Sequence, residues 1–110
     1  MRAKRISIFI NEGDKWHGRP LHLALLEALV KEGMAGATVV RGVAGYTKDV
    51  GITTTSLVDT GGQLPLVVEF IDSEDNIERM MPVITEMVGP RLVTTMDVDI
   101  RHGGAFSDTP

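Results

Sequence analysis

Apolar residues recur along the chain with two spacings, one typical of strands and one of helices. Isoleucines alternate with Ser7 and Phe9 over residues 5–10, a period of two that predicts a strand with its isoleucine face in the core. Runs rich in β-branched and apolar residues predict three more strands. They span residues 37–43, 64–71 and 92–100. In the last strand, alternate residues from Leu92 to Ile100 share one apolar face.

Two other segments have apolar residues at helical spacing. The first follows Gly18, with Pro20 in its first turn. Its apolar stripe comprises Leu21, Ala24, Leu25, Ala28 and Leu29. Gly33 fits the position just beyond the end of this helix. The second helix begins at Asp72 or Ser73, either of which can cap it, and ends at Gly89. Pro82 predicts a kink in this helix or a position on its solvent side.

The order of these elements predicts the fold. Strand, helix, strand, long connection, strand, helix and strand follow one another, which is the split βαβ arrangement. We therefore expect an α+β fold with a ferredoxin-like βαββαβ antiparallel sheet and two helices on one face. Residues 1–110 are expected to form a single domain. If both crossovers are right-handed, the connections 11–19, 44–64 and 88–91 emerge at one end of the sheet, where a site is most easily built.

Composition and charge narrow the function classes. Eleven Lys and Arg against fifteen Asp and Glu give a net charge of -4, so we expect no nucleic-acid partner. The absence of cysteine excludes disulfides, thiolate metal sites and a cysteine nucleophile. No apolar run approaches the roughly 18 residues of a membrane span, so no membrane insertion is expected. With no signal-peptide core either, we expect a cytoplasmic protein.

The connection over residues 44–63 is unusually long. Loops longer than about 12 to 15 residues in a compact domain are usually functional or disordered. The alternation of apolar and polar residues over 52–59 fits an additional strand as well as it fits a loop. The flanks 45–51 and 60–63 are candidates for mobility. Residues 104–110 are expected to form a flexible tail.

Glycines and arginines at the strand ends are candidates for anion binding. Arg41, Gly42 and Gly45 lie where a strand enters the long connection. Glycine lets backbone N–H groups approach an anion, and arginine adds charge-assisted hydrogen bonds. The alternative is a hairpin exit that requires positive φ. Arg91 and Arg101 supply further cations at turns.

The loop before the first helix is a second candidate, because a helix N-terminus favours anions. It contains Lys15, Trp16, His17 and Arg19, and Trp16 fits a stacking platform, an oligomer contact or a lid on the core. No GxSxG motif or nucleophile triad is present, so no catalytic residue is predicted. The histidine spacing is not that of a helical metal pair, and no metal site is predicted.

Three strings in the chain resemble a known family. They are GDKWHGRPL at 13–21, GMAGATVVRG at 33–42 and LPLVVE at 64–69. They resemble the PII-like uncharacterised family known as domain of unknown function 190, over residues 6–100. More remotely, the arrangement is similar to the PII nitrogen-regulatory signalling proteins, which are ferredoxin-like trimers.

The resemblance implies a homotrimer with three clefts between subunits. PII relatives bind adenine nucleotides there, between the long loop of one subunit and the short helix-to-strand loop of the next. The motif positions imply that the ligand-binding residues are Arg41, Gly42, Gly45, Gly89, Arg91 and Arg101. Possible loop contacts are Lys15, Trp16, His17, Arg19 and Tyr46. Pro90 departs from the PII pattern, where the short loop has glycine, and Arg91 replaces a lysine.

The leading hypothesis is therefore a non-enzymatic trimeric regulator. It binds an adenine nucleotide or another small anion and contacts a partner, such as a membrane transporter, through its long loop. One alternative is a small acylphosphatase-like enzyme that uses Arg19. Another is a CutA-like metal-binding trimer, which requires His17, His22 and His102 to converge.

Overall fold

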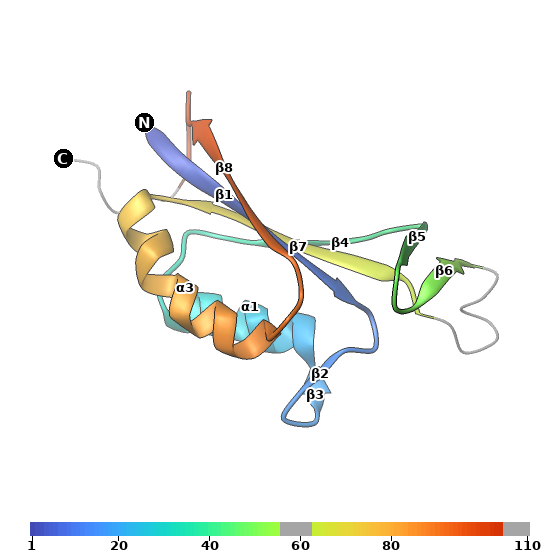
Figure 1. The fold of residues 1–110 in the computed structure, drawn as a ribbon. Coiled ribbons are helices and arrows are strands. Elements are labelled where there is room, and N and C mark those ends of the chain that lie inside the picture. The colour runs from blue at the N-terminus through green and yellow to red at the C-terminus, as the bar shows by residue number, and fades with distance from the viewer. Residues whose placement is uncertain (56–62, 105–110) are drawn as a thin grey trace.

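The computed structural model describes residues 1–55 and 63–104 (Figure 1). Its elements are β1 (Arg2–Asn11), β2 (Lys15–Trp16), β3 (Arg19–Pro20), α1 (Leu21–Lys31), β4 (Thr38–Arg41), β5 (Ala44–Thr47), β6 (Gly51–Thr54), β7 (Pro65–Asp72), α3 (Glu74–Val88) and β8 (Val93–Asp99). Among the described residues, no helix is long and apolar enough to span a membrane.

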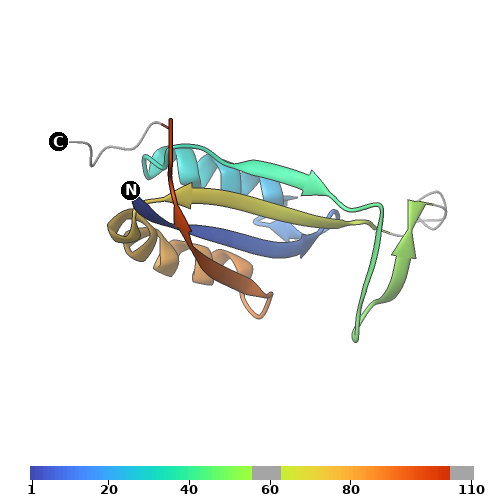
Figure 2. The same ribbon diagram turned by 90° about the horizontal axis from the view of Figure 1, so that it is seen from above.

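One four-stranded antiparallel sheet has the order β4-β7-β1-β8, and both helices lie on the same face of it (Figures 1 and 2). The predicted ferredoxin-like α+β fold is confirmed. Asn11 pairs with Pro65, and Arg41 pairs with Leu66. The amide of Phe9 donates to the carbonyl of Leu92 across 3.0 Å. The three connections 11–19, 44–64 and 88–91 therefore emerge at one end of the sheet, as predicted, and we call this the loop end.

The core lies between the sheet and the two helices. Ile6, Ile8 and Ile10 are buried, which confirms the predicted inward face of β1. The other buried apolar residues of this cluster come mainly from the two helices and from β7. They are Leu21, Ala24, Leu25, Leu29, Met34, Leu66, Val68, Phe70, Ile77, Met80, Ile84, Met87 and Val88. Pro82 is exposed within α3, so its solvent-side position is confirmed.

The helix ends follow the predicted capping chemistry. Gly33 has φ +78° just beyond α1, a value that L side chains rarely adopt. The Met34 amide donates to the Leu29 carbonyl (3.0 Å) and the Gly33 amide to the Val30 carbonyl (3.1 Å), which is a Schellman motif. Ser73 caps α3, because its hydroxyl accepts from the Asn76 amide.

Asp72 is a buried carboxylate that joins two parts of the chain. Its oxygens accept from the Ala35 amide (2.9 Å), the Ser73 amide (2.8 Å) and the Asn76 side-chain amide (2.7 Å). The carboxylate therefore holds the α1–β4 connection against the start of α3. Sequence analysis treated Asp72 only as a possible helix cap, and Ser73 takes that role.

Two hairpins occupy segments that were predicted as connections. Residues 44–47 and 51–54 pair as β5 and β6, so the region 44–63 is not a continuous loop. The strand predicted over 52–59 is confirmed only in its first part, because residues 56–62 lie outside the described part of the chain, as do residues 105–110. In the loop 11–19, Trp16 pairs with Arg19 around His17 and Gly18. His17 and Gly18 both have positive φ, as a type I′ hairpin turn requires.

Replacing Asp72 by alanine should lower the free energy of unfolding by about 2 to 3 kcal/mol, because three donors lose a charged acceptor. Asp75→Ala, at an exposed position in the first turn of the same helix, should cost less than about 1 kcal/mol. Urea denaturation of both variants measures the difference. Equal losses in the two variants would show that Asp72 does not join these elements.

Candidate functional site

Arg41 leaves the sheet at the loop end, where it is already paired. Its Nε lies 2.9 Å from Oε2 of Glu12, and its side chain is about half exposed. Oε1 of Glu12 accepts from the Leu64 amide at 3.3 Å. Glu12 therefore connects the end of β4 to the residue that precedes β7.

The two glycines after Arg41 are required by close packing rather than by their torsion angles. Neither Gly42 nor Gly45 has positive φ, so the hairpin-exit explanation is wrong. The Gly42 amide donates to the Pro65 carbonyl across 2.8 Å. A Cβ at Gly42 would lie 2.8 Å from Cγ of Pro65, and one at Gly45 would lie 3.0 Å away. The backbone therefore passes directly over the Pro65 ring.

Arg91 is held in the short turn between α3 and β8. Its Nε donates to Oδ2 of Asp14 at 2.8 Å, and its Nη1 donates to the Val88 carbonyl at 2.9 Å. The same Asp14 oxygen accepts from the Asn11 amide at 2.8 Å. Gly89 begins the turn with φ +58°. The turn Gly89-Pro90-Arg91 is thus attached to the connection that follows β1.

The β2–β3 hairpin positions the other cluster of candidate residues. The rings of Trp16 and His17 stack, with centroids 4.1 Å apart and planes 17° apart. Trp16 also packs against the core, which fits a core lid. Arg19 forms an ion pair with Glu27 of α1, and its hydrogen bond lowers the pKa of the Glu27 carboxyl. Lys15 is exposed at the start of the hairpin.

Arg101 is a candidate ligand-binding residue that does not lie at the loop end of its own chain. Asp99 pairs with Arg2, and the Ile100 amide donates to the Met1 carbonyl, so Arg101 follows β8 at the opposite end of the sheet. His102 lies there as well, so it does not converge with His17 and His22 within one chain. In residues 1–55 and 63–104, no group of three His, Asp or Glu side chains could hold a metal ion.

Tyr46 belongs to the β5–β6 hairpin, which lies off the end of the main sheet (Figure 2). Tyr46 pairs with Ile52, and the two residues are 75% and 69% exposed. Val43 and Val50 are also exposed here. Four large apolar side chains within residues 43–52 are therefore exposed to solvent in the single chain.

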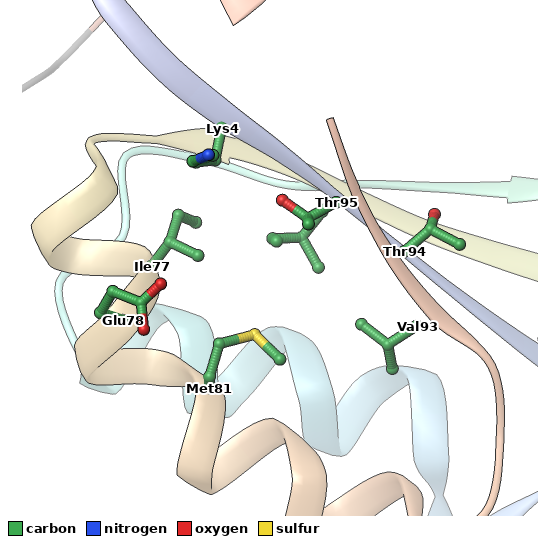
Figure 3. A pocket seen from close by; sticks show the side chains of 8 residues that line it. Lys4, Ile77, Glu78, Met81, Val93, Thr94 and Thr95 are labelled. Carbon is green, nitrogen blue, oxygen red and sulfur yellow. The ribbon is translucent and has the colours of Figure 1, made fainter. Parts of the chain in front are cut away.

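A cavity of about 240 Å³ lies on the helix side of β8, away from these candidates (Figure 3). Ile6, Ile77, Met81 and Val93 form its apolar wall. Lys4 lies at its edge and donates a hydrogen bond to Asp97, which raises the pKa of Lys4 and lowers the pKa of Asp97.

Sequence reasoning missed Glu12 and Asp14, the carboxylates that pair with Arg41 and Arg91. A usable signal existed, because the connection 11–19, which contains both acids, was predicted to emerge at the same end of the sheet as Arg41 and Arg91. Pro65 was missed as well, and no sequence pattern indicates that its ring lies under Gly42.

Comparison with known proteins decides the family. A family model described as "Uncharacterized ACR, COG1993", DUF190, matches residues 3–100. The chain belongs to the DUF190 family. A UPF0166 protein of Methanocaldococcus jannaschii is 33% identical over 107 residues, covering 96% of this chain and 98% of the relative. A UPF0166 protein of Aquifex aeolicus is 36% identical over 102 residues, covering 91% and 94%.

Solved structures show that this DUF190 chain has a PII-like fold. One is CPII, a nitrogen regulatory PII-like protein from Thiomonas intermedia K12, bound to ADP, AMP and bicarbonate. It superposes with a TM-score of 0.61 at 16% identity, over 93% of this chain and 91% of CPII. CPII bound to ADP, AMP and acetate gives a TM-score of 0.62 at 13% identity, over 92% and 90%. The resemblance predicted from the sequence is confirmed for family and fold.

The Arg91–Asp14 pair should contribute to stability at the loop end of the DUF190 chain. A double-mutant cycle with Arg91→Ala and Asp14→Ala should give a coupling energy of about 1 to 2 kcal/mol, because both side chains are mostly buried, at 32% and 19% exposure. The Arg19–Glu27 pair is the matched control, and its 50% and 61% exposure predicts a coupling near the error of measurement. Equal coupling in the two cycles, measured by urea denaturation, would contradict this role.

Proposed function

We propose that this protein is a trimeric, non-enzymatic regulator that binds an adenine nucleotide, or a chemically similar small anion, in clefts between its copies. The observation that carries the proposal is that Arg41, Gly42 and the Gly89–Arg91 turn lie at the same end of the sheet, on its two opposite edges. Arginines and closely approached backbone are the groups that bind phosphate. CPII, whose fold is similar, is bound to ADP and AMP, which supports the same ligand class here.

The position of Arg101 supports a site shared between copies. Within one chain it lies at the far end of the sheet from Arg41 and Arg91. Only a neighbouring copy can therefore bring Arg101 to the same ligand. Arg41 and Arg91 lie at opposite edges of the sheet within one chain, so a cleft at the junction of two copies is also the arrangement that can place the Arg41 of one copy near the Arg91 of the next.

Both loop-end arginines are occupied by carboxylates, which determines how a ligand binds. A phosphate at Arg41 must replace Glu12, and a phosphate at Arg91 must replace Asp14. Because the arginines gain one anion and lose another, the net gain in binding energy is modest. Such an exchange suits a reversible sensor better than a tightly bound cofactor.

Replacement of Glu12 by a ligand would also affect the structure next to Arg41. The same carboxylate group that pairs with Arg41 accepts from the Leu64 amide, at the end of the connection 44–63. A ligand that releases Glu12 from Arg41 therefore changes how this connection is held where it re-enters the sheet. A ligand with unequal affinity for the two arrangements shifts their populations, which a partner can sense.

The β5–β6 hairpin is the surface we assign to that partner. A two-stranded hairpin is marginally stable alone in water, and this one exposes Tyr46, Ile52 and Val43. Contact with a partner, such as a membrane transporter, would bury these side chains. The proposal thus connects the ligand, the long connection and the partner through one segment of chain.

The alternative functions have less support. In the acylphosphatase-like alternative Arg19 must bind the substrate phosphate, yet it is paired with Glu27. In the CutA-like alternative three histidines must meet, yet His102 lies at the other end of the sheet from His17. We therefore assign no catalytic role.

Adenine nucleotides should raise the melting temperature of the protein, because they bind only the folded trimer. Arg41→Ala should shift the half-saturating nucleotide concentration upward by roughly tenfold, through loss of a charge-assisted contact. Arg79→Ala, on α3 away from the loop end, should leave that concentration unchanged. The measurement is thermal shift with ATP, ADP, AMP and a cyclic nucleotide, beside a solution mass.

Isothermal calorimetry measures nucleotide binding directly and can contradict the proposal. If none of these nucleotides binds at millimolar concentration, the ligand class is wrong. A monomeric mass would overturn the shared cleft.

A further inference from the structure

The face of the main sheet that carries no helix, which we call the open face, has an ordered arrangement of side chains. Strand register places Arg5 between Met96 of β8 and Ile71 of β7. Four residues further along β1, beyond a row of polar residues, Phe9 and Val40 lie on either side of Val67. Phe9, Val40 and Met96 are 42%, 49% and 53% exposed. Apolar side chains therefore flank a polar centre on both sides.

The polar centre contains Ser7 and Glu69, which lie directly opposite each other. Ser7 is buried, and its hydroxyl donates to Oε1 of Glu69 across 3.2 Å. This is the one side-chain hydrogen bond that Glu69 makes among the described residues. A carboxylate has about four acceptor sites, so most of the acceptor capacity of Glu69 is unused within the chain.

Arg5, in contrast, has hydrogen-bond donors that lack good acceptors within the chain. Its Nε is buried and has no hydrogen-bond partner, and its Nη2 donates to the Met96 sulfur at 2.9 Å. A thioether is a weak acceptor. Over residues 1–55 and 63–104, no carboxylate forms an ion pair with Arg5. Arg5 as a whole is only partly buried, so the unmet hydrogen-bonding need lies at Nε, and an anion from outside the chain would meet it.

Arg5 and Glu69 line one cavity of about 200 Å³ on this face, next to the residues that precede β4. The Arg5 guanidinium and the Glu69 carboxylate thus line the same cavity but do not form an ion pair with each other. A second copy of the chain presents the same two charges and the same apolar residues. The open face is therefore complementary in charge to another copy of itself.

We propose that neighbouring copies pack through their open faces and that Arg5 of each copy pairs with Glu69 of the next. The inference rests on the proposed trimer and names the contact that holds it together. A contact between two different patches repeats around a closed ring, so a trimer forms it three times. Burial of the flanking Phe9, Val40 and Met96 excludes water and strengthens each ion pair.

Charge reversal tests the pair. R5E and E69R should each raise the trimer dissociation constant at least roughly tenfold, because each places like charges in contact at every interface. The double variant R5E/E69R should restore the wild-type mass. Sedimentation equilibrium over a range of concentrations measures the mass, and circular dichroism reports whether each variant folds.

Mixing the single variants distinguishes contacts between copies from a contact within one chain. R5E and E69R chains combined in one ring have opposite charges wherever unlike chains meet. Because a ring of three has an odd number of members, two of its three interfaces are favourable in any mixed trimer. The mixture should therefore form trimers at concentrations where each variant alone does not.

Two control variants complete the design. K31E reverses an exposed charge at the end of α1, away from the open face, and should leave the mass unchanged. R5K keeps the cation and should weaken assembly less than R5E. A general loss of folding would also prevent rescue in the mixture and in the double variant.

The possible outcomes separate this inference from the proposed function. If the wild type is a trimer and both reversals remain trimers at wild-type concentrations, the Arg5–Glu69 contact is wrong and the proposed trimer stands. If the double variant rescues but the mixture does not, the pair forms within one chain and the inference is overturned. A monomeric wild type overturns both.

Discussion

A sheet with helices on only one face leaves its other face to be covered by something else. In this chain both helices pack on the isoleucine side of β1, and the core lies there. The open face keeps Phe9, Val40 and Met96 half exposed, and burial of the exposed half of each side chain would gain on the order of 1 kcal/mol. It also holds Arg5 without an anion. Association of copies through this face, as we propose, would bury these apolar side chains and pair Arg5 with an anion. It would also add a shared apolar interface to the small core of each subunit.

The same strand order sets where we propose that ligands bind. Because the connections 11–19, 44–64 and 88–91 all emerge at one end of the sheet, residues distant in sequence become neighbours there. Arg91 and Asp14 are 77 positions apart and share a hydrogen bond. These ion pairs hold the arginines in place and also neutralise them, so an anionic ligand competes with the protein's own carboxylates. Through Glu12, that competition reaches Leu64 and the long connection. In this account, assembly uses one face of the sheet and the ligand response uses one end of it.

The fold was predictable from the sequence because burial leaves a local periodic signal. Alternating isoleucines located β1, and helical stripes with Gly33 located α1 and its end. The β5–β6 hairpin was not resolved in advance, since short alternating segments fit strand and loop equally well. The β2–β3 hairpin was missed because its turn needs positive φ at His17, which few non-glycine residues adopt. Ion pairs such as Arg41–Glu12 depend on side-chain placement across the fold, and composition alone does not indicate them.

The central claim is that copies cover the open face in solution, and oxidative footprinting of the wild-type protein tests it with one residue type. Met96 lies on the open face and is more than half exposed in the single chain, whereas Met81 is partly buried on α3. Methionine oxidation follows exposure of the sulfur. Our account predicts that Met96 is oxidised more slowly than Met81 in the assembled protein. Faster oxidation of Met96 than of Met81 would contradict it.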